Sequence, residues 1–183
     1  MAITPQLEQL LHELLAEREI HKVLTRYCRG VDRCDLELLE SCFHDDAIDD
    51  HGNWVLQATE ATADIIRRVK PGPDAAMHFL GNVHIEVEGE TAFAESYLLA
   101  FRTAHREERA YTRTRAIRFI DRFTLRNNEW RISERVVVDD WNRIDEIVQS
   151  MPDSPLFRYS SKDRHDPVYA IREGRVAREP GAV

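Results

Sequence analysis

Three residues that lie far apart in the sequence could together move a proton. His78 lies among apolar residues in the segment AAMHFLGN. An imidazole in an apolar wall can act as a general base when a carboxylate fixes its tautomer and stabilises its charged form. Asp32 follows a long segment with helical spacing, and a carboxylate buried there would need a partner. Arg135 shares an alternating strand face with Val137, where a fixed cation could stabilise developing negative charge.

Each of these residues also has a purely structural explanation. A histidine beside apolar residues is more often a satisfied member of the core. An aspartate after a helix is usually a local cap. The sequence alone therefore leaves open whether Asp32, His78 and Arg135 meet.

An acidic stretch could bind a divalent metal. It has four aspartates between two histidines, namely His44, Asp45, Asp46, Asp49, Asp50 and His51. No spacing in it matches a defined metal loop, so a solvated turn with a strand edge is the simpler interpretation. The chain also has no phosphate-binding glycine loop, no GxSxG or HExxH motif and no dinucleotide fingerprint. We therefore expect neither a metal nor a cofactor.

Seven arginines lie between positions 102 and 122, namely Arg102, Arg106, Arg109, Arg113, Arg115, Arg118 and Arg122. On a strand, Arg113 and Arg115 would share a face with Ile117 and Phe119. Such a cluster could bind an anion or a nucleic acid. The chain has 25 Lys+Arg against 33 Asp+Glu, a net charge of −8. We therefore favour ion pairs with the acidic helices or a subunit interface, and expect no nucleic-acid partner.

The composition predicts a single domain. A chain of 183 residues has the length of one domain, and area scaling buries about 70% of its surface on folding. No run approaches the ~20 apolar residues of a membrane span, and the N-terminal residues lack the basic start of a secretory signal. Cys28, Cys34 and Cys42 are odd in number and lack CxxC spacing. They indicate reduced thiols and a cytoplasmic protein.

Hydrophobic spacing predicts three helices in the N-terminal part of the chain. The predicted helices are 5–31, 35–42 and 58–69, with residues 46–51 extended. Thr4 and Pro5 suit the start of the first helix, and Asp35 suits the cap of the second. The third should end before Pro71-Gly72-Pro73, which cannot continue a helix.

From residue 75 the spacing changes to a period of two, which predicts strands. Turns are expected at 89–90 and 127–128, and the long strands are 91–105, 109–126 and 129–141. In the last strand, one face should carry Trp130, Ile132, Val136 and Val138, and the other Ser133, Arg135, Val137 and Asp139. Helices followed by antiparallel strands indicate the α+β class. Residues 150–183, with several prolines and many charges, suggest an irregular tail.

Three segments resemble landmarks of the SnoaL-like proteins, which belong to the nuclear-transport-factor-2-like superfamily. YCRGVDRCDLELLESCFHDDA is similar to the end of the family's long helix, with its tyrosine, its aspartate and its following short helix. MHFLGNVHIEVEGETAFAESYLLAF resembles the histidine and Gly-Asn pair that accompany two strands. NNEWRISERVVVDDW resembles the turn, tryptophan and last long strand. The resemblance covers residues 15 to about 142 and includes the scytalone dehydratase, hexachlorocyclohexane dehydrochlorinase and bile-acid dehydratase branch.

The resemblance implies a cone-shaped α+β barrel, in which three N-terminal helices close a curved antiparallel or mixed sheet around an apolar pocket. It implies a domain over residues 1–143 and leaves 144–183 as a tail that packs on the domain or on a neighbouring subunit.

The resemblance also implies roles for individual residues. Asp32 and His78 fall on the Asp–His pair at the pocket floor of the dehydratases and the dehydrochlorinase. Arg135 falls on an arginine important in the dehydrochlorinase. Tyr27 falls on a functional tyrosine of bile-acid dehydratase, where the dehydrochlorinase has a lysine.

This chain departs from those enzymes at two points. Leu99 and Ala100 are apolar where bile-acid dehydratase has an active-site carboxylate. Scytalone dehydratase has a second pocket histidine, for which His84 and His105 are candidates. The substrate and the acid partner therefore stay open.

We expect a cofactor-independent lyase for a small apolar substrate that is cyclic or aromatic. His78 would remove a proton from carbon, and Asp32 would orient His78. Arg135 would stabilise an oxyanion or leaving group, and Tyr27 would bind the substrate or protonate a departing hydroxyl. Loss of water is expected ahead of loss of halide or carbon–carbon cleavage. The expected pocket walls are Phe43, Trp54, Phe79, Phe101 and Trp141.

Other functions fit the same resemblance. An isomerase or polyketide cyclase would use the same proton transfer. A non-catalytic β-subunit of a ring-hydroxylating dioxygenase or a ligand-binding module would use none. We also expect a homotrimer or homodimer without membrane contact, joined through the outer sheet face by Tyr111, Ile117, Phe119 and Phe123.

Overall fold

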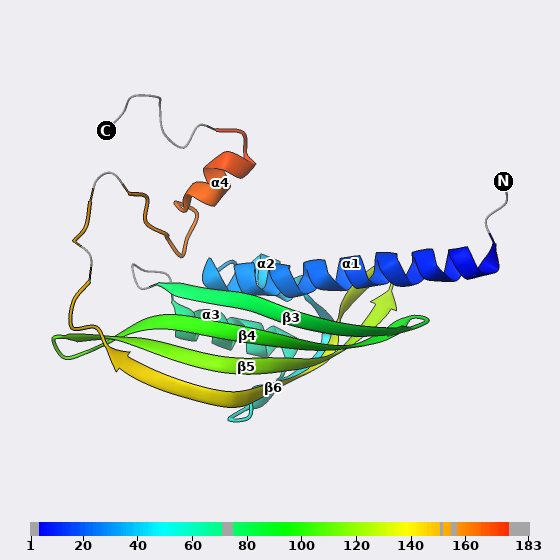
Figure 1. The fold of residues 1–183 in the computed structure, drawn as a ribbon, viewed down its shortest axis with the longest axis horizontal. Helices are drawn as coiled ribbons and strands as arrows, with labels where there is room; N and C mark the ends of the chain where they lie inside the picture. Colours follow the sequence, from blue (N-terminus) through cyan, green and yellow to red (C-terminus); the bar gives the residue numbers. More distant parts are fainter. Residues whose placement is uncertain (1–3, 71–74, 151, 155–156, 176–183) are drawn as a thin grey trace.

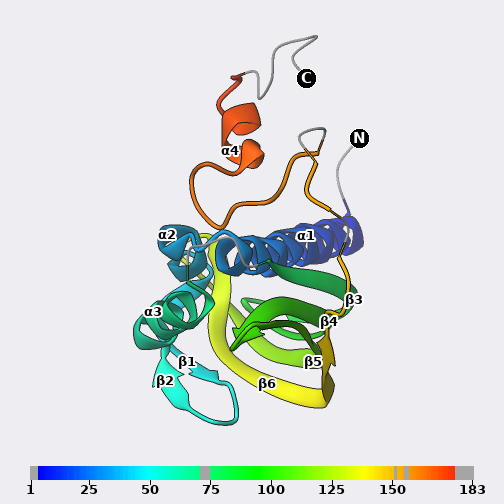
Figure 2. The same cartoon turned by 90° about the vertical axis from the view of Figure 1, so that its left-hand side faces the viewer.

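A long helix, α1 (Pro5–Asp32), lies across the concave side of a curved sheet (Figures 1 and 2). The structure is a computed structural model that describes residues 4–70, 75–150, 152–154 and 157–175. The helix begins where the sequence predicts, because the Thr4 side chain accepts a hydrogen bond from the main-chain N–H of Leu7 at 3.3 Å. It ends at Asp32, one residue later than expected, and this terminus positions the site described below.

Two shorter helices pack beside the end of α1. The helix α2 (Leu36–Glu40) is capped by Asp35, whose side chain accepts from the N–H of Leu38 at 3.2 Å, as the sequence predicts. Gly30 lets α2 approach closely, since a Cβ there would lie 3.0 Å from the main-chain nitrogen of Leu39. The helix α3 has the expected bounds, Ala58–Val69. Pro71 and Pro73, from which the end of this helix was predicted, lie outside the described residues.

Six strands form one open, mixed sheet. They are β1 (Phe43–Asp50), β2 (Val55–Gln57), β3 (Ala76–Glu88), β4 (Thr91–Arg106), β5 (Arg109–Arg126) and β6 (Glu129–Glu146). Their order is β2-β1-β6-β5-β4-β3, with β1 and β6 parallel and the other neighbours antiparallel. The α+β class and the curved mixed sheet are confirmed. The expected barrel is wrong, because β2 and β3 remain separate edges and the helices cover the space between them (Figure 2).

A bulge in β6 overturns the predicted faces of that strand. Arg122 pairs with Glu134, but its neighbour Phe123 pairs with Ile132, so Ser133 is an extra residue in the ladder. One extra residue reverses the alternation beyond it. For this reason Trp130, Ile132, Arg135 and Val137 are all buried on the same face.

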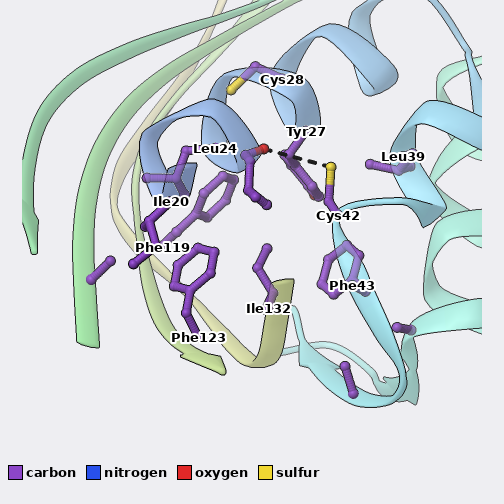
Figure 3. Close-up of a cluster of buried hydrophobic side chains, with 14 of the residues drawn as sticks. Ile20, Leu24, Tyr27, Cys28, Leu39, Cys42, Phe43, Phe119, Phe123 and Ile132 are labelled. Atoms are coloured by element: carbon purple, nitrogen blue, oxygen red, sulfur yellow. Dashed lines mark hydrogen bonds between the residues drawn. The ribbon is translucent and has the colours of Figure 1, made fainter. Parts of the chain in front are cut away.

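The core lies between α1 and the concave face of the sheet (Figure 3). Ile20 and Leu24 of α1 and Phe119, Phe123 and Ile132 of the sheet are all at most 2% exposed. This location corrects the predicted subunit interface. Phe119, Phe123 and also Ile117, which is 4% exposed, face inward and pack in the core, so they cannot form an outer contact surface.

The C-terminal segment returns to the domain. The strand β6 runs to Glu146, past the domain boundary expected at residue 143, and the tail includes a short helix, α4 (Pro167–Arg172). The hydroxyl of Tyr169, which is 4% exposed, donates to Asp35 at 3.2 Å. The Lys162 ammonium donates to the main-chain oxygen of Val69 at 3.1 Å. Within its described residues the tail thus contacts the start of α2 and the end of α3 of its own chain. None of the described helices has the length and apolar character needed to cross a membrane.

Candidate active site

The end of α1 and the start of β3 bring Asp32 and His78 into contact. The main-chain N–H of His78 donates to Asp32 Oδ2 at 2.9 Å, and the ring Nδ1 bonds to Asp32 Oδ1 at 2.7 Å. The Asp32 side chain is 13% exposed and that of His78 is 17% exposed. Both carboxylate oxygens are therefore committed to one residue, which fixes the ring in position.

This contact determines the tautomer of the neutral His78 ring. A carboxylate can only accept, so Nδ1 must carry the hydrogen that it donates to Asp32. The other nitrogen, Nε2, then keeps its lone pair, and it has no hydrogen-bond partner among the described residues. His78 lines a cavity of about 750 Å³, so a proton acceptor is available at its wall.

The cavity lies between the helices and one end of the curved sheet. Tyr27, Ile65 and Val69 contribute to its helical wall, and Ala100 contributes to its sheet wall beside His78. Its volume is in the usual range for small-molecule sites. Ala100 leaves this part of the wall without a carboxylate, in keeping with the departure seen in the sequence.

Arg135 lies behind Tyr27 rather than at the cavity surface. Its side chain is 0% exposed, and Nε and Nη2 each donate to Asp121 at 2.7 Å. Its guanidinium lies 4.2 Å from the ring centroid of Tyr27 and 3.8 Å from that of Phe119. Arg135 is absent from the cavity lining, so this structure does not place it in contact with a substrate.

The buried guanidinium of Arg135 keeps its charge and acts on Tyr27. Burial alone would lower the pKa of Arg135, but the contact with Asp121 raises that pKa above its usual range, so the guanidinium stays charged. Burial also raises the pKa of Tyr27 well above its ordinary value, although the nearby Arg135 opposes the shift. Tyr27 is therefore a neutral phenol that can donate a hydrogen bond into the cavity that it lines.

A second imidazole–carboxylate pair faces the same cavity. His51 Nδ1 donates to Asp49 Oδ1 at 2.8 Å, and the ring of His51 stacks on Trp54 with centroids 4.2 Å apart. Asp49 is 0% exposed, and its other oxygen, Oδ2, has no partner among the described residues. His51 and Trp54 line the cavity. The sequence analysis did not predict this pair. The Asp-x-His spacing in a segment expected to be extended could have indicated it, because residues two apart on a strand share a face.

The other residues of the acidic stretch lie on β1 and differ in their exposure. Asp45 and Asp46 are exposed, whereas His44 is buried and donates to the main-chain oxygen of Thr124 at 2.9 Å. In the part of the chain that the structure describes, no group of three or more His, Cys, Asp or Glu side chains could hold a metal ion.

The five aromatic residues that were expected to line the pocket lie in three different places. Trp54 and Phe101 line the cavity. Phe43 belongs to the core and is 2% exposed. Phe79 and Trp141 are exposed and do not line the cavity. They belong to the cross-strand row next to that of His78, Ala100 and Arg115, and adjacent rows point to opposite faces of a sheet.

The two histidine candidates for a second pocket residue lie outside the cavity lining. His84 is exposed on β3 beside Glu86. His105, at the C-terminal end of β4, borders a smaller pocket that shares Arg113 and Ile144 with the cavity lining.

Comparison with known proteins identifies a matching domain family and solved structures with a similar fold. A sequence model of the SnoaL-like domain matches residues 12–136. The crystal structure of the hexachlorocyclohexane dehydrochlorinase LinA-type3 from Novosphingobium barchaimii LL02 is similar, with a TM-score of 0.67 and 17% identity over 78% of this chain and 99% of that one. A putative scytalone dehydratase from Novosphingobium aromaticivorans has a TM-score of 0.63 and 18% identity, over 81% of this chain and 97% of that one.

A third similar structure is that of a putative dehydratase from the NTF2-like family of Streptomyces avermitilis. Its TM-score is 0.59 and its identity 15%, over 69% of this chain and 98% of that one. A search of curated protein sequences found no match. At these identities the structural likeness establishes the fold alone.

The buried pair generates a prediction about stability. Replacing Asp121 by Asn leaves the Arg135 charge buried without its partner, and we expect a loss of about 3–5 kcal/mol in the free energy of unfolding. Urea unfolding followed by circular dichroism measures this loss. Asp46→Asn, which removes an exposed partner of Arg126, is the control and should change stability within the error of the measurement. A loss below about 1 kcal/mol for Asp121→Asn would show that the pair is not needed to hold Arg135.

Proposed function

The chain belongs to the SnoaL-like domain family, and we propose that it is a cofactor-independent lyase in which His78 removes a proton from a carbon atom of the substrate. The known proteins that it resembles include a dehydrochlorinase and a putative dehydratase, which supports lyase chemistry in general. The observation that carries the proposal is the double contact of Asp32 with the His78 main chain and ring at a cavity wall.

The geometry supports a base of defined orientation. With Nδ1–H bonded to Asp32, His78 Nε2 accepts the proton from carbon. The charge that then forms on the imidazole is stabilised by the Asp32 carboxylate. Tyr27 donates a hydrogen bond to the substrate oxygen, and Arg135 acts as a positioning residue through the ring of Tyr27.

The leaving group needs a proton when it departs as water. His51 supports this role, because it lines the same cavity and Asp49 holds its ring. The two imidazoles come from opposite edges of the sheet: His78 lies on the edge strand β3, and His51 follows β1, the partner of the other edge strand, β2. Histidine is the usual proton donor near neutral pH, where a buried phenol is a poor acid. Elimination of water is therefore our preferred reaction. In it the neutral His78 ring takes the proton from carbon, and the His51 ring, with hydrogen on both nitrogens, gives its Nε2 proton to the departing hydroxyl while Nδ1–H stays on Asp49.

An isomerase or polyketide cyclase reaction would use the same base. Proton removal by His78 followed by return to another carbon needs no leaving group. Incubation in D₂O separates the two reactions. An isomerase gives a product with the same atoms as the substrate and exchanges deuterium into it. A product lighter by one water or one hydrogen halide identifies the lyase.

The role of His78 is tested by replacing it with Ala. We expect turnover of cyclic β-hydroxy or β-halo ketones to fall by about 10²–10⁴-fold, since a general base contributes that much. Formation of the conjugated product is followed by ultraviolet absorbance. His84→Ala is the matched control, because His84 is an exposed histidine on the same strand. A His78→Ala protein that folds and turns over at the wild-type rate would end the proposal.

The role of Asp32 is tested by Asp32→Asn. The amide can hold the ring in the wrong tautomer, so we expect kcat to fall by about 10²–10⁴-fold with little change in KM. The split between kcat and KM distinguishes orientation of His78 from a general loss of structure, which would also weaken binding. A change in kcat of less than about fivefold would contradict the assigned role.

We further propose that the protein self-associates through the outer face of the sheet. The residues that form this surface differ from those expected from the sequence. Phe79, Leu99, Ala116 and Trp141 are successive partners across β3, β4, β5 and β6, which forms an apolar row on the outer face. Phe79 is 61% exposed and Trp141 50% exposed. An exposed apolar surface of this kind is typical of a protein interface, and a second copy would cover it with the same row.

Sedimentation velocity tests the assembly. We expect the wild type to sediment as a dimer or trimer of the 21.3 kDa chain, and Phe79→Gln/Trp141→Gln to sediment as a monomer. Val55→Gln, at an exposed position on β2, is the control and should leave the assembly intact. A wild-type monomer at micromolar concentration would exclude this interface.

A further inference from the structure

We propose that the cavity binds a substrate with an anionic end, a carboxylate or a phosphate, and that Arg113 of β5 recognises this group. The inference rests on the proposed function, because it concerns the substrate of the same site. It assigns a role to the arginine-rich strand that the proton-transfer chemistry leaves unexplained.

The cavity wall has the opposite charge to the protein as a whole. Five arginines line it, namely Arg68, Arg102, Arg113, Arg115 and Arg143. Asp139 is the one carboxylate among the described lining residues. The chain has a net charge of −8, so this concentration of positive charge is local. A concave site lined by one sign of charge attracts ligands of the opposite sign.

Three of these arginines are neutralised by neighbouring carboxylates. Arg115 Nε donates to Asp139 at 2.9 Å, Arg143 pairs with Asp145 at 2.8 Å, and Arg68 pairs with Asp64. They shape the wall and are not the primary candidates for a ligand contact.

Arg113 differs from these three. Its side chain is exposed, and among the described residues it has neither a hydrogen bond nor an ion pair. Arg102 donates instead to main-chain oxygens at the end of α3, including that of Val69 at 3.3 Å, which fixes its guanidinium beside the cavity. The cavity wall thus has two neighbouring arginines. The guanidinium of Arg102 is bonded to the end of α3, and that of Arg113 is available to a ligand.

The register of the sheet places these two cations face to face. Arg102 of β4 is the direct cross-strand partner of Arg113 of β5. A carboxylate or phosphate at Arg113 would accept hydrogen bonds from its guanidinium, and the planar fork of arginine matches both groups.

The same register gives the distance from the anion site to the base. His78 pairs with Ala100, which pairs with Arg115, so these residues form one row across three strands. Arg102 and Arg113 belong to the next row on the same face, two residues along, which is about 7 Å. This separation corresponds to the size of a substituted ring. An apolar body beside Trp54 and an anionic end at Arg113 would therefore place a ring carbon near His78.

Isothermal titration calorimetry with three naphthalene probes tests this inference. The probes are 2-naphthoate, 2-naphthyl phosphate and the uncharged 2-naphthylmethanol. We expect wild-type protein at low salt to bind at least one anion about tenfold more tightly than the alcohol, and 0.5 M NaCl to reduce this preference. The two anions distinguish a carboxylate site from a phosphate site. Equal affinity for all three probes, or a preference that salt does not change, would overturn the proposal.

Variants then locate the contact. Arg113→Gln should reduce the anion preference to about threefold or less, whereas affinity for the alcohol should not change. Arg122→Gln is the matched control, because Arg122 is an exposed arginine of the same strand on the outer face, and it should keep the preference. An Arg113→Gln protein that retains the full preference would show that Arg113 is not the contact.

His78→Ala separates this proposal from the proposed function. It should keep the anion preference, because the base is not part of the anion contact. Anion binding without any effect of His78→Ala on turnover would refute the reaction and leave the binding site standing. Loss of turnover in His78→Ala, together with equal affinity for the three probes, would support the reaction and refute the anion site.

Discussion

The contact between Asp32 and His78 joins the end of the long helix to an edge strand of the sheet, and the rest of the site is arranged around it. Asp32 is the last residue of α1, and its two oxygens accept from the main chain and the ring of a single residue on β3. Gly30, two residues earlier, allows α2 to pack closely against the same helix end. The helices are thereby fixed over one end of the concave sheet, and the cavity remains between them.

The charges around the cavity are arranged by depth. At the deepest level, Arg135 and Asp121 form a pair without solvent exposure beneath Tyr27. At the wall, two imidazoles are each held by a carboxylate, His78 by Asp32 and His51 by Asp49. Arginines add positive charge to the same lining. In the proposed reaction, the buried Arg135 positions Tyr27, the two imidazoles transfer protons, and the exposed Arg113 recognises the substrate.

Much of the fold follows from local signals in the sequence. Thr4 and Asp35 cap the helices that they were expected to cap, and the bounds of α3 were predicted correctly. The resemblance to the SnoaL-like proteins implied the Asp32–His78 pair, whereas the residue types alone left open whether the two side chains meet. What could not be predicted depends on long-range register. The extra residue Ser133 reverses the faces of β6, and no local signal marks a bulge at a serine. The burial of Asp49 likewise depends on the parallel pairing of β1 with β6, two strands far apart in the sequence. Local periodicity gives the elements, but pairing determines which side chains meet.

The tautomer of the His78 ring tests the account most directly, since it requires no substrate. Nitrogen-15 NMR of histidine-labelled protein, with His78→Gln to assign the resonances, reports which ring nitrogen carries the hydrogen. In the neutral form of the ring we expect the hydrogen on Nδ1 and a lone pair on Nε2, as the contact with Asp32 requires. A neutral ring with its hydrogen on Nε2 would contradict the account, because no lone pair would then be available to take a proton from carbon.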